Sequence, residues 1–354
     1  MDVLVLAIAF FVILLGAELF TNGIEWFGRK LELAEGAVGS VLAAVGTALP
    51  ETMIPIIAIL FAGSEGHGSE EVGIGAILGA PFMLATLAMF VTGMGVLIWR
   101  KRRLTGTRMP VDTVVLVHDI RTFVVAYALA IGAAFLPPEL SFGKPLVALA
   151  LLVIYAWYVR SHFKADAQVD VSDLAPLRFH RLDRRGRRNE PDVPRLRIVN
   201  VQVLFALACI VGGAYLFVGA VQHIASALGL SEILLALVIA PIATELPEKF
   251  NSLIWVRQGK DTLAMGNITG AMVFQSAIPT VVALIFAGDS WRITQDSLIA
   301  FLSAGMAFVA VAAVFLPMWR HARLDGRSLL VGGIVYVAYL GIVVLALAGI
   351  LAVG

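Results

Sequence analysis

The sequence carries one short pattern twice, GTALPE at residues 46–51 and ATELPE at residues 243–248. The two copies lie 197 positions apart, and at the same separation GAELF at residues 16–20 matches GAYLF at residues 213–217. This constant offset indicates that the chain is built from two copies of one unit. Each copy also places a proline and a glutamate inside a long apolar segment, which is an unusual position for both residues.

The apolar segments predict membrane helices. Sixty per cent of the 354 residues are hydrophobic and 14% are charged, whereas soluble domains carry about 25% charged residues. Residues 2–20 have neither the positive charge nor the cleavage site of a signal peptide, so they are interpreted as a first membrane helix. A membrane helix needs about 20 apolar residues. Ten candidate segments lie roughly at 3–24, 36–62, 72–99, 113–136, 145–160, 199–224, 231–257, 262–287, 295–318 and 328–353.

A polar central stretch organises these segments into five and five. We expect a first repeat at residues 1–160, a polar cytoplasmic loop at residues 161–198, and a second repeat at residues 199–354. A repeat of five spans returns the chain to the opposite side of the membrane, so the two copies are inverted. The predicted fold is an all-α membrane protein with ten transmembrane helices arranged as two inverted five-helix repeats.

The basic residues predict how the chain lies in the membrane. Of the 26 lysines and arginines, 23 lie in or beside the connections that follow odd-numbered helices. By the positive-inside rule these connections face the cytoplasm, so both termini lie outside, and the plasma membrane is the expected location. Because these cations flank membrane segments, their expected partner is the lipid bilayer and not nucleic acid. Five tryptophans near cytoplasmic helix ends are interpreted as an aromatic belt: Trp26, Trp99, Trp157, Trp255 and Trp319.

Glu51 and Glu248 lie in the middle of the second apolar segment of each repeat. A charged side chain at the centre of a membrane costs about 2.5–3.5 kcal/mol on insertion scales, so each glutamate needs a compensating partner. Thr47 precedes Glu51 by four positions, as Thr244 precedes Glu248, so each pair shares one face of its helix. A single copy would also fit a kinked helix whose glutamate pairs with a neighbouring side chain, but two symmetry-related copies favour a shared cation.

The prolines of the repeated pattern add oxygen ligands. Pro50 cannot donate to the carbonyl of Gly46, and Pro247 cannot donate to that of Ala243. Each copy thus offers a carboxylate, a hydroxyl and a freed carbonyl within one helical turn. All three are hard oxygen ligands of the kind that calcium prefers, so two facing copies predict a site for a divalent cation.

These motifs resemble those of the cation/calcium exchanger superfamily, which includes sodium/calcium and proton/calcium exchangers. Each repeat of that superfamily typically carries Gly-Thr-Ser-x-Pro-Glu, followed one helix later by Gly-Asn-x-x-Gly-Ser-Asn, which GNITGA at residues 266–271 matches in part. The resemblance covers nearly the whole chain. It implies an antiporter without a cofactor, in which Glu51 and Glu248 bind the transported calcium, helped by Thr47 and Thr244. It also implies that helices 1 and 6 slide past the others during transport.

The chain departs from the superfamily pattern at positions that serve sodium in the sodium-coupled relatives. Altered residues stand there: Ala48, Ala76, Ala80, Pro81, Leu84, Glu245, Ala271 and Met272. Asn267 and Gln275 keep polar side chains and are expected to be accessory ligands. We therefore predict an antiporter that exchanges calcium, or a similar divalent cation, for protons at a midplane site. The alternatives are a sodium-coupled calcium exchanger and, from another class, a membrane scaffold or sensor that transports nothing.

Three further charged residues lie within the membrane segments. Glu245 and Lys249 are spaced to share a helix face and predict a buried pair. The alternatives are Glu245 as a proton carrier, Lys249 as a tethered cation, or Lys249 at the lipid interface. Glu18 either hydrogen-bonds locally or lines the access path to the site.

Other polar residues are assigned no transport chemistry. Asp119 and Arg121, at the start of a cytoplasmic helix, are interpreted as an interfacial charge group, and the six histidines show no metal-ligand spacing. No nucleophile–base pair has a spacing that suits an intramembrane hydrolase, so we expect no enzymatic activity. Glycines that favour close helix contacts are Gly36, Gly39, Gly73, Gly75, Gly79, Gly266 and Gly270.

Overall fold

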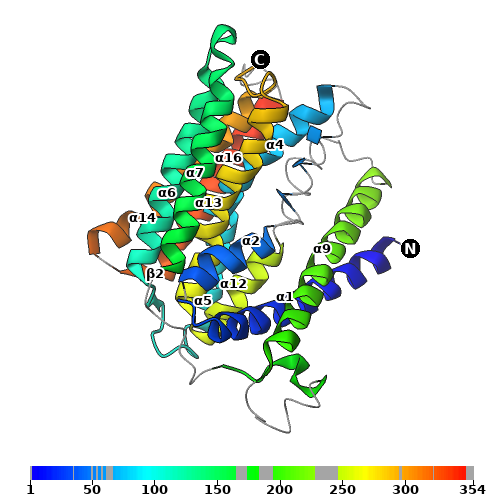
Figure 1. Cartoon of the computed structure of the whole chain (residues 1–354), viewed down its shortest axis with the longest axis vertical. Helices are drawn as coiled ribbons and strands as arrows, with labels where there is room; N and C mark the ends of the chain where they lie inside the picture. Colours follow the sequence, from blue (N-terminus) through cyan, green and yellow to red (C-terminus); the bar gives the residue numbers. More distant parts are fainter. Residues whose placement is uncertain are drawn as a thin grey trace.

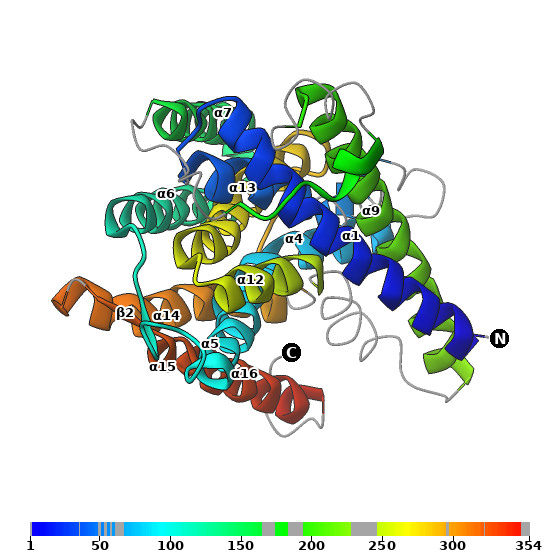
Figure 2. The ribbon, with the colours of Figure 1, turned by 90° about the horizontal axis from the view of Figure 1, so that it is seen from below.

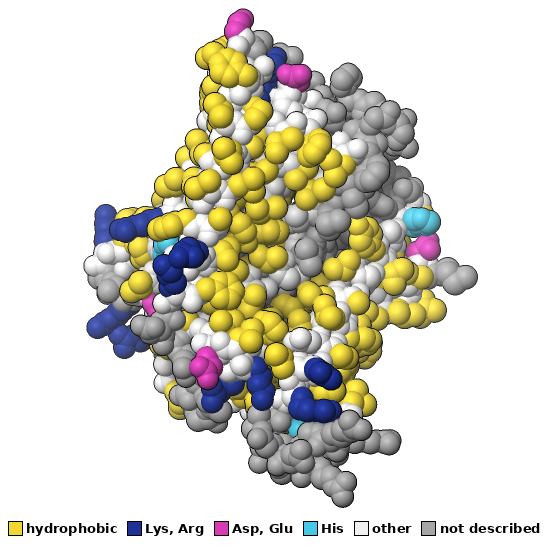
Figure 3. Space-filling view, viewed as in Figure 1, with side chains coloured by type: hydrophobic (Ala, Val, Ile, Leu, Met, Phe, Trp, Pro, Cys, Tyr) yellow, Lys and Arg dark blue, Asp and Glu magenta, His cyan; other side chains and the backbone are white. Residues whose placement is uncertain are grey.

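Hydrophobic helices make up most of the described chain. The computed structural model describes residues 2–34, 36–48, 51–52, 55–56, 59–60, 67–164, 174–182, 194–227, 246–294, 297–321 and 323–347. Within these residues, eight helices are long and apolar enough to cross a membrane. Hydrophobic side chains cover the middle of the face seen in Figure 3, and Lys and Arg side chains gather at its left and lower edges. The predicted all-α membrane fold is confirmed.

The helices of the first half follow the predicted segments. They are α1 (Asp2–Lys30), the π-helical η1 (Ala37–Ala43) continued by α2 (Ala44–Thr47), α4 (His67–Met83), the π-helical η3 (Leu84–Ala88), α5 (Met89–Trp99), α6 (Thr113–Gly132) and α7 (Gly143–Phe163). Short 3-10 turns follow α6 at η4 (Ala133–Phe135) and η5 (Pro138–Leu140). Together α4, η3 and α5 form the third predicted helix.

The second half repeats this order. It contains the 3-10 turn η6 (Arg178–Leu182), then α9 (Leu196–Ala227), α12 (Leu246–Gln258), α13 (Asp261–Phe286), α14 (Leu298–His321), α15 (Gly326–Leu329) and α16 (Val331–Leu347). The seventh predicted helix is described only from residue 246, because residues 231–245 lie outside the described part. Every one of the ten predicted segments contains helix, in agreement with two five-helix repeats.

Two parts of the molecule differ in how their helices pack. Helices α1 and α9, the first of each repeat, lie side by side along one edge of the molecule in Figures 1 and 2. We call them the α1–α9 pair. Helices α6 and α7 pack along α13, whose residues are mostly buried, and η1 packs against the same helix. We call η1, α6, α7 and α13 the central block.

Glycine lets η1 and α13 approach each other backbone to backbone. A Cβ atom built on Gly270 would lie 2.0 Å from the Ser40 carbonyl oxygen, and one built on Gly266 would lie 2.8 Å from Ser40 Oγ. The predicted close contact is therefore confirmed for these two glycines. Among the described atoms, none lies within 4 Å of a Cβ built on Gly75 or Gly79. The second helix of repeat one thus crosses the third helix of repeat two with the two backbones in direct contact.

A short antiparallel ladder, absent from the all-α prediction, joins the two repeats. Strand β1 (Arg108–Met109) follows the third predicted helix and pairs with β2 (Leu324–Asp325), which follows the ninth. Helices α1, α5, α7, α12 and α14 finish at this same end, which we call the basic end. Its described cations are Arg29, Lys30, Arg100, Lys101, Arg102, Arg103, Arg108, Arg160, Lys164, Arg257, Lys260, Arg320, Arg323 and Arg327.

Candidate cation site

Thr47 ends α2, and its hydroxyl reaches from the first repeat to the second. The residue is fully buried, and its Oγ1 lies 3.2 Å from Asn267 Oδ1 on α13. The same hydroxyl lies 3.0 Å from the carbonyl oxygen of Ala43, one turn earlier. A hydroxyl has one hydrogen and two lone pairs. When the hydrogen is donated to Ala43, the lone pairs of Thr47 remain available to a cation.

Glu51 lies four residues beyond Thr47 in a helical stretch. Only 9% of the residue is exposed. A carboxylate buried to this extent in a membrane protein needs a cation or hydrogen-bond donors around it. Gly46, whose carbonyl was predicted as a ligand, is buried within α2. These three residues of the first motif therefore lie in the interior.

A series of hydrogen bonds continues from α13 to α12. Asn267 is fully buried, and its Nδ2 donates to Ser252 Oγ at 3.4 Å. Ser252 Oγ in turn donates to the carbonyl oxygen of Ala264 at 3.1 Å. Because Ser252 follows Glu248 by four positions, the two residues share a face of α12. The series from Thr47 through Asn267 to Ser252 joins three helices that carry predicted site residues.

Several predicted ligands fall outside the described part of the chain. The backbone of Glu248 belongs to α12, but its side chain is outside the described part. Ala243, Thr244 and Glu245 lie outside it altogether. The meeting of the Glu51 and Glu248 carboxylates therefore stays a prediction, as does the pairing of Glu245 with Lys249.

The accessory residues have different surroundings. Gln275 on α13 is 2% exposed, and neither amide atom has a hydrogen-bond partner among the described residues. Lys249 on α12 is 4% exposed. The Glu18 side chain, in contrast, is about half exposed, and its Oε1 lies 2.8 Å from Arg178 Nη2 of the turn η6. The structure thus places Glu18 in a surface ion pair with the central loop.

Residues without ligand atoms are packed into the core close to these helices. Ala48, Leu84 and Ala271 are each fully buried. Ala48 follows Thr47 directly, and Ala271 lies one turn after Asn267. A hard cation needs oxygen ligands to replace its water, so the side chains at these positions contribute no ligand.

Three buried polar residues near the motif helices were missed from the sequence. Besides Ser252, they are Asn251 on α12, which is fully buried, and Thr52, which is 4% exposed. Neither the Asn251 amide nor the Thr52 hydroxyl has a hydrogen-bond partner among the described residues. The spacing of four from Glu248 was an available signal for Ser252. The spacing of three from Glu248 was a similar signal for Asn251, whereas no spacing singles out Thr52.

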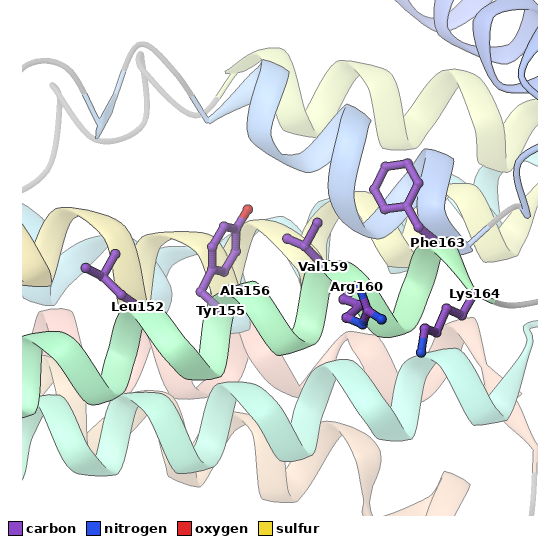
Figure 4. A pocket seen from close by; sticks show the side chains of 7 residues that line it. All are labelled: Leu152, Tyr155, Ala156, Val159, Arg160, Phe163 and Lys164. Carbon is purple, nitrogen blue, oxygen red and sulfur yellow. The ribbon is translucent and has the colours of Figure 1, made fainter.

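A hollow on α7 contains none of these residues. It has a volume of about 610 Å³ and is lined by Leu152, Tyr155, Ala156, Val159, Arg160, Phe163 and Lys164 (Figure 4). The lining is mainly apolar, and its cations would repel a positive ion. This hollow is therefore unsuited to a cation.

The fold and the motif helices define a class of protein. Long apolar helices in two similar halves, with a buried acidic residue and buried oxygen atoms where the halves meet, are typical of secondary membrane transporters. The family model described as sodium/calcium exchanger protein matches residues 1–161 and 199–348. The chain belongs to this sodium/calcium exchanger family, and it is an integral membrane antiporter of cations.

Individual relatives resemble the chain over nearly its whole length. A putative antiporter, CaxA, of Alkalimonas amylolytica is 26% identical over 341 residues, which cover 90% of this chain and 92% of the relative. The inner membrane protein YrbG of Escherichia coli (strain K12) is 25% identical, covering 86% of this chain and 85% of the relative. A structure of the sodium-calcium exchanger NCX_Mj soaked with zero Na+ and Ca2+ matches with a TM-score of 0.68 at 17% identity, covering 96% of this chain and 98% of that one. This last likeness shows the fold.

Proposed function

We propose that this antiporter exchanges calcium, or a similar divalent cation, for protons at a site between its two inverted repeats. The observation that carries the proposal is the buried approach of Thr47 Oγ1 to Asn267 Oδ1. It joins the motif helix of the first repeat to α13 of the second, one turn before the buried Glu51. A cation held at this point can bind oxygen atoms from both repeats.

The chemistry of the ligands and the relatives both favour calcium. Carboxylate, hydroxyl, amide and carbonyl oxygens are hard ligands suited to calcium. The relative CaxA is described as a putative antiporter, and structures of NCX_Mj were obtained with Na+, Ca2+ and Sr2+.

In the proposed mechanism the two glutamates hold either a divalent cation or protons. Without a cation, two neighbouring carboxylates repel each other and are poorly solvated, so proton binding neutralises them. Exchange follows because only a neutralised site crosses between the outward and inward states. The residues that replace the water of the cation are Glu51, Glu248, Thr47, Thr244 and the carbonyls of Gly46 and Ala243.

Sodium-coupled calcium exchange is the alternative, and one observation favours it. Gln275 is buried with an amide oxygen that accepts no hydrogen bond from the described residues, so this oxygen is available to an ion. Ala48, Leu84 and Ala271 argue in the other direction, since a dedicated sodium site needs several fixed oxygens.

The same proposal includes an orientation. The repeats comprise residues 1–160 and 199–354, and the loop at 161–198 connects them on the cytoplasmic side of the plasma membrane. The basic end faces the cytoplasm because positive charge is retained on that side. Both termini then lie outside.

Gradient-driven flux separates proton from sodium coupling. The purified protein is placed in lipid vesicles, and calcium uptake is measured at fixed pH with a sodium gradient, then at fixed sodium with a pH gradient. We expect the pH gradient to drive uptake more strongly. Strong drive by sodium alone, with no effect of pH, would establish the sodium-coupled alternative.

Neutral variants of the motif test the site itself. Glu51→Gln and Glu248→Gln each remove one negative charge while keeping the side-chain shape, so we expect both to abolish calcium flux without preventing membrane insertion. Glu139→Gln, at an exposed position in η5, is the matched control and should transport normally. Wild-type flux in both motif variants would refute the assigned site.

A further inference from the structure

Asp119 on α6 is a buried carboxylate outside the candidate cation site. It is fully buried, contrary to its interpretation as an interfacial charge. Its Oδ2 accepts hydrogen bonds from Ser40 Oγ at 2.7 Å and Thr269 Oγ1 at 2.6 Å, and its Oδ1 accepts one from the Tyr158 hydroxyl at 2.9 Å. A buried carboxylate is tolerated when donors surround it in this way. Asp119 therefore connects η1, α13 and α7 to its own helix.

His162 on α7 brings a titratable ring to the same carboxylate. Its Nε2 lies 3.0 Å from Asp119 Oδ1, and its Nδ1 lies 3.1 Å from the Tyr158 carbonyl oxygen. Both neighbours are acceptors, whereas a neutral imidazole has only one N–H group. Nε2 lies within ion-pair distance of the carboxylate, so a proton on His162 is stabilised by the neighbouring Asp119.

A second histidine links this pair to the basic end. His118 is half-buried in the second turn of α6, and its ring centroid lies 5.1 Å from that of His162. Its Nε2 lies 2.7 Å from Ser161 Oγ, near the end of α7. His118 therefore stands between the buried pair and water at the basic end.

Few titratable groups face His162 within the described part of the chain. On α6 they are Asp119 and His118, and on α7 they are Tyr158 and, beside it, Tyr155 with its ring 6.0 Å away. The faces of η1 and α13 that meet the pair contribute only hydroxyl groups. A change of charge on the pair is thus not offset by another described ionisable group from those two elements.

The groups held by Asp119 lie on the helices that form the candidate cation site. Ser40 is two turns before Thr47, and Thr269 is two residues after Asn267. At this level η1 and α13 touch backbone to backbone, as Gly270 shows. His162 also packs against the start of η1, because a Cβ built on its N-cap residue Gly36 would lie 3.4 Å from His162 Cδ2.

We propose that Asp119 and His162 form a proton-binding site, separate from the transport glutamates, through which pH at the basic end controls the crossing of η1 and α13 and so the rate of exchange. With His162 protonated, the Asp119 carboxylate shares its charge between the imidazolium and the hydroxyl donors, which weakens the hydrogen bonds from Ser40 and Thr269. Loss of the proton leaves the full carboxylate charge to these hydroxyl groups and tightens this contact. The effect on exchange rests on the proposed function, whereas proton binding to the pair does not.

The proton site is tested first without transport. Histidine-labelled protein in detergent is titrated by NMR, and the His162 signal is assigned by its absence in His162→Gln. We expect Asp119→Asn to move the midpoint of His162 to lower pH by about one unit, a tenfold loss of proton affinity. Tyr158→Phe, which removes a donor from the carboxylate without burying a new charge, should move the midpoint to higher pH. Tyr158→Phe still tests the proton site if Asp119→Asn does not fold. His223→Gln, at an exposed position on α9, should change nothing.

The link to exchange is tested in vesicles of defined orientation. The pH is varied only at the basic end while calcium flux is measured at constant pH on the other side. We expect His162→Gln to keep transport but to make the pH dependence of the flux shallower than in the wild type, the remaining dependence coming from protons exchanged at the transport glutamates, and we expect His223→Gln to follow the wild type. Profiles of His162→Gln and wild type that coincide would overturn the regulatory role. A His162 midpoint unmoved by Asp119→Asn and Tyr158→Phe would overturn the site. Absence of flux in the wild type would instead refute the proposed function, and the titration would still decide the proton site.

Discussion

The central block and the α1–α9 pair differ in which residues join their helices. In the block, polar groups of Asp119, Ser40, Thr269 and Tyr158 cross-link the helices at fixed distances. In the pair, Gln202 of α9 donates to the Leu19 carbonyl oxygen and to Asn22 Oδ1 of α1, and glycines fit against the facing helix. A Cβ built on Gly16 would lie 3.0 Å from Ile210 Cγ1. Directional bonds fix the relative position of helices, so each part is held together internally. Apolar contacts between the two parts, such as Gly28 of α1 against Val38 of η1, suit movement of the pair as one unit past a fixed block.

The pair meets the rest of the molecule beside the candidate site. A Cβ built on Gly46 would lie 2.7 Å from Phe20 Cζ of α1 and 3.3 Å from Leu207 Cδ2 of α9. Gly46 directly precedes Thr47, so both helices of the pair touch the motif helix at the predicted ligands. Movement of the pair across this glycine would therefore change access to the site.

Locking the pair to the block should have the largest effect on transport. A Cβ built on Gly28 of α1 lies 3.5 Å from Val38 Cβ of η1, at the short end of the usual disulfide range of about 3.5–4.5 Å. In a Cys209→Ser background, Gly28→Cys with Val38→Cys should lose most of its calcium flux on oxidation and regain it on reduction. Flux measured in vesicles before and after each treatment checks this expectation.

The matched control locks the two helices of the pair to each other. A Cβ built on Gly16 lies 3.1 Å from Cys209 Cβ on α9, slightly below the usual disulfide range, so Gly16→Cys can form a disulfide with the native cysteine once the two helices separate by a few tenths of an ångström. If the pair moves as one unit, oxidation of this variant should leave the flux largely intact. Equal inhibition of both variants would contradict the division into a moving pair and a fixed block.

A methyl group added at a glycine should destabilise the protein more in the central block than in the α1–α9 pair. Gly270→Ala places its Cβ 2.0 Å from a backbone oxygen, whereas Gly16→Ala meets Ile210 Cγ1 at 3.0 Å and the Ala206 carbonyl oxygen at 3.1 Å. Overpacking costs typically about 1–3 kcal/mol, and we expect Gly270→Ala to reach the upper end because a backbone yields little. Gly16→Ala should cost less, because its neighbours need to move by only a few tenths of an ångström and alanine favours helix. Unfolding of both variants in detergent measures the difference, and equal costs would refute it.

The membrane helices could be predicted because their signal is local. Length and hydropathy identify each apolar segment, and the repeated motif with its proline and glutamate identified the second helix of each repeat. Thr47 and Asn267, both named from the sequence, lie together in the structure. The approach of the two glutamates depends on packing between the repeats and stays a prediction.

Buried polar partners could not be predicted, because they come from helices distant in sequence. The donors to Asp119 lie on three other elements, so its position near a helix start suggested an interface. The same reasoning was wrong for Trp255, which was assigned to an aromatic belt. Trp255 is fully buried, and its Nε1 donates to Glu25 Oε1 at 2.7 Å. Proximity to a helix end does not reveal whether another helix covers that end.

The smallest expected effects concern the ion pair of Glu25 and Lys260, which joins α1 to the start of α13. Its carboxylate accepts from Trp255 and forms an ion pair with Lys260, whose side chain is 20% exposed. Breaking a fully buried pair costs about 3–5 kcal/mol. With Lys260 partly solvated and Trp255 still donating, we expect Lys260→Ala to cost about 1–2 kcal/mol, and Glu25→Gln with Lys260→Ala to cost less than the sum of the single changes.

The control is Arg178→Ala, which removes the half-exposed partner of Glu18. Because that ion pair is exposed, its loss should cost below about 1 kcal/mol. Because the ion pair of Glu25 and Lys260 opposes separation of α1 from α13 at the basic end, Lys260→Ala should also expose this end more often, measured in a Cys209→Ser background as faster labelling of a cysteine introduced at Val256, which is buried near the end of α12. Additive stability effects together with unchanged labelling would show that Glu25 and Lys260 do not hold α1 against the central block at the basic end.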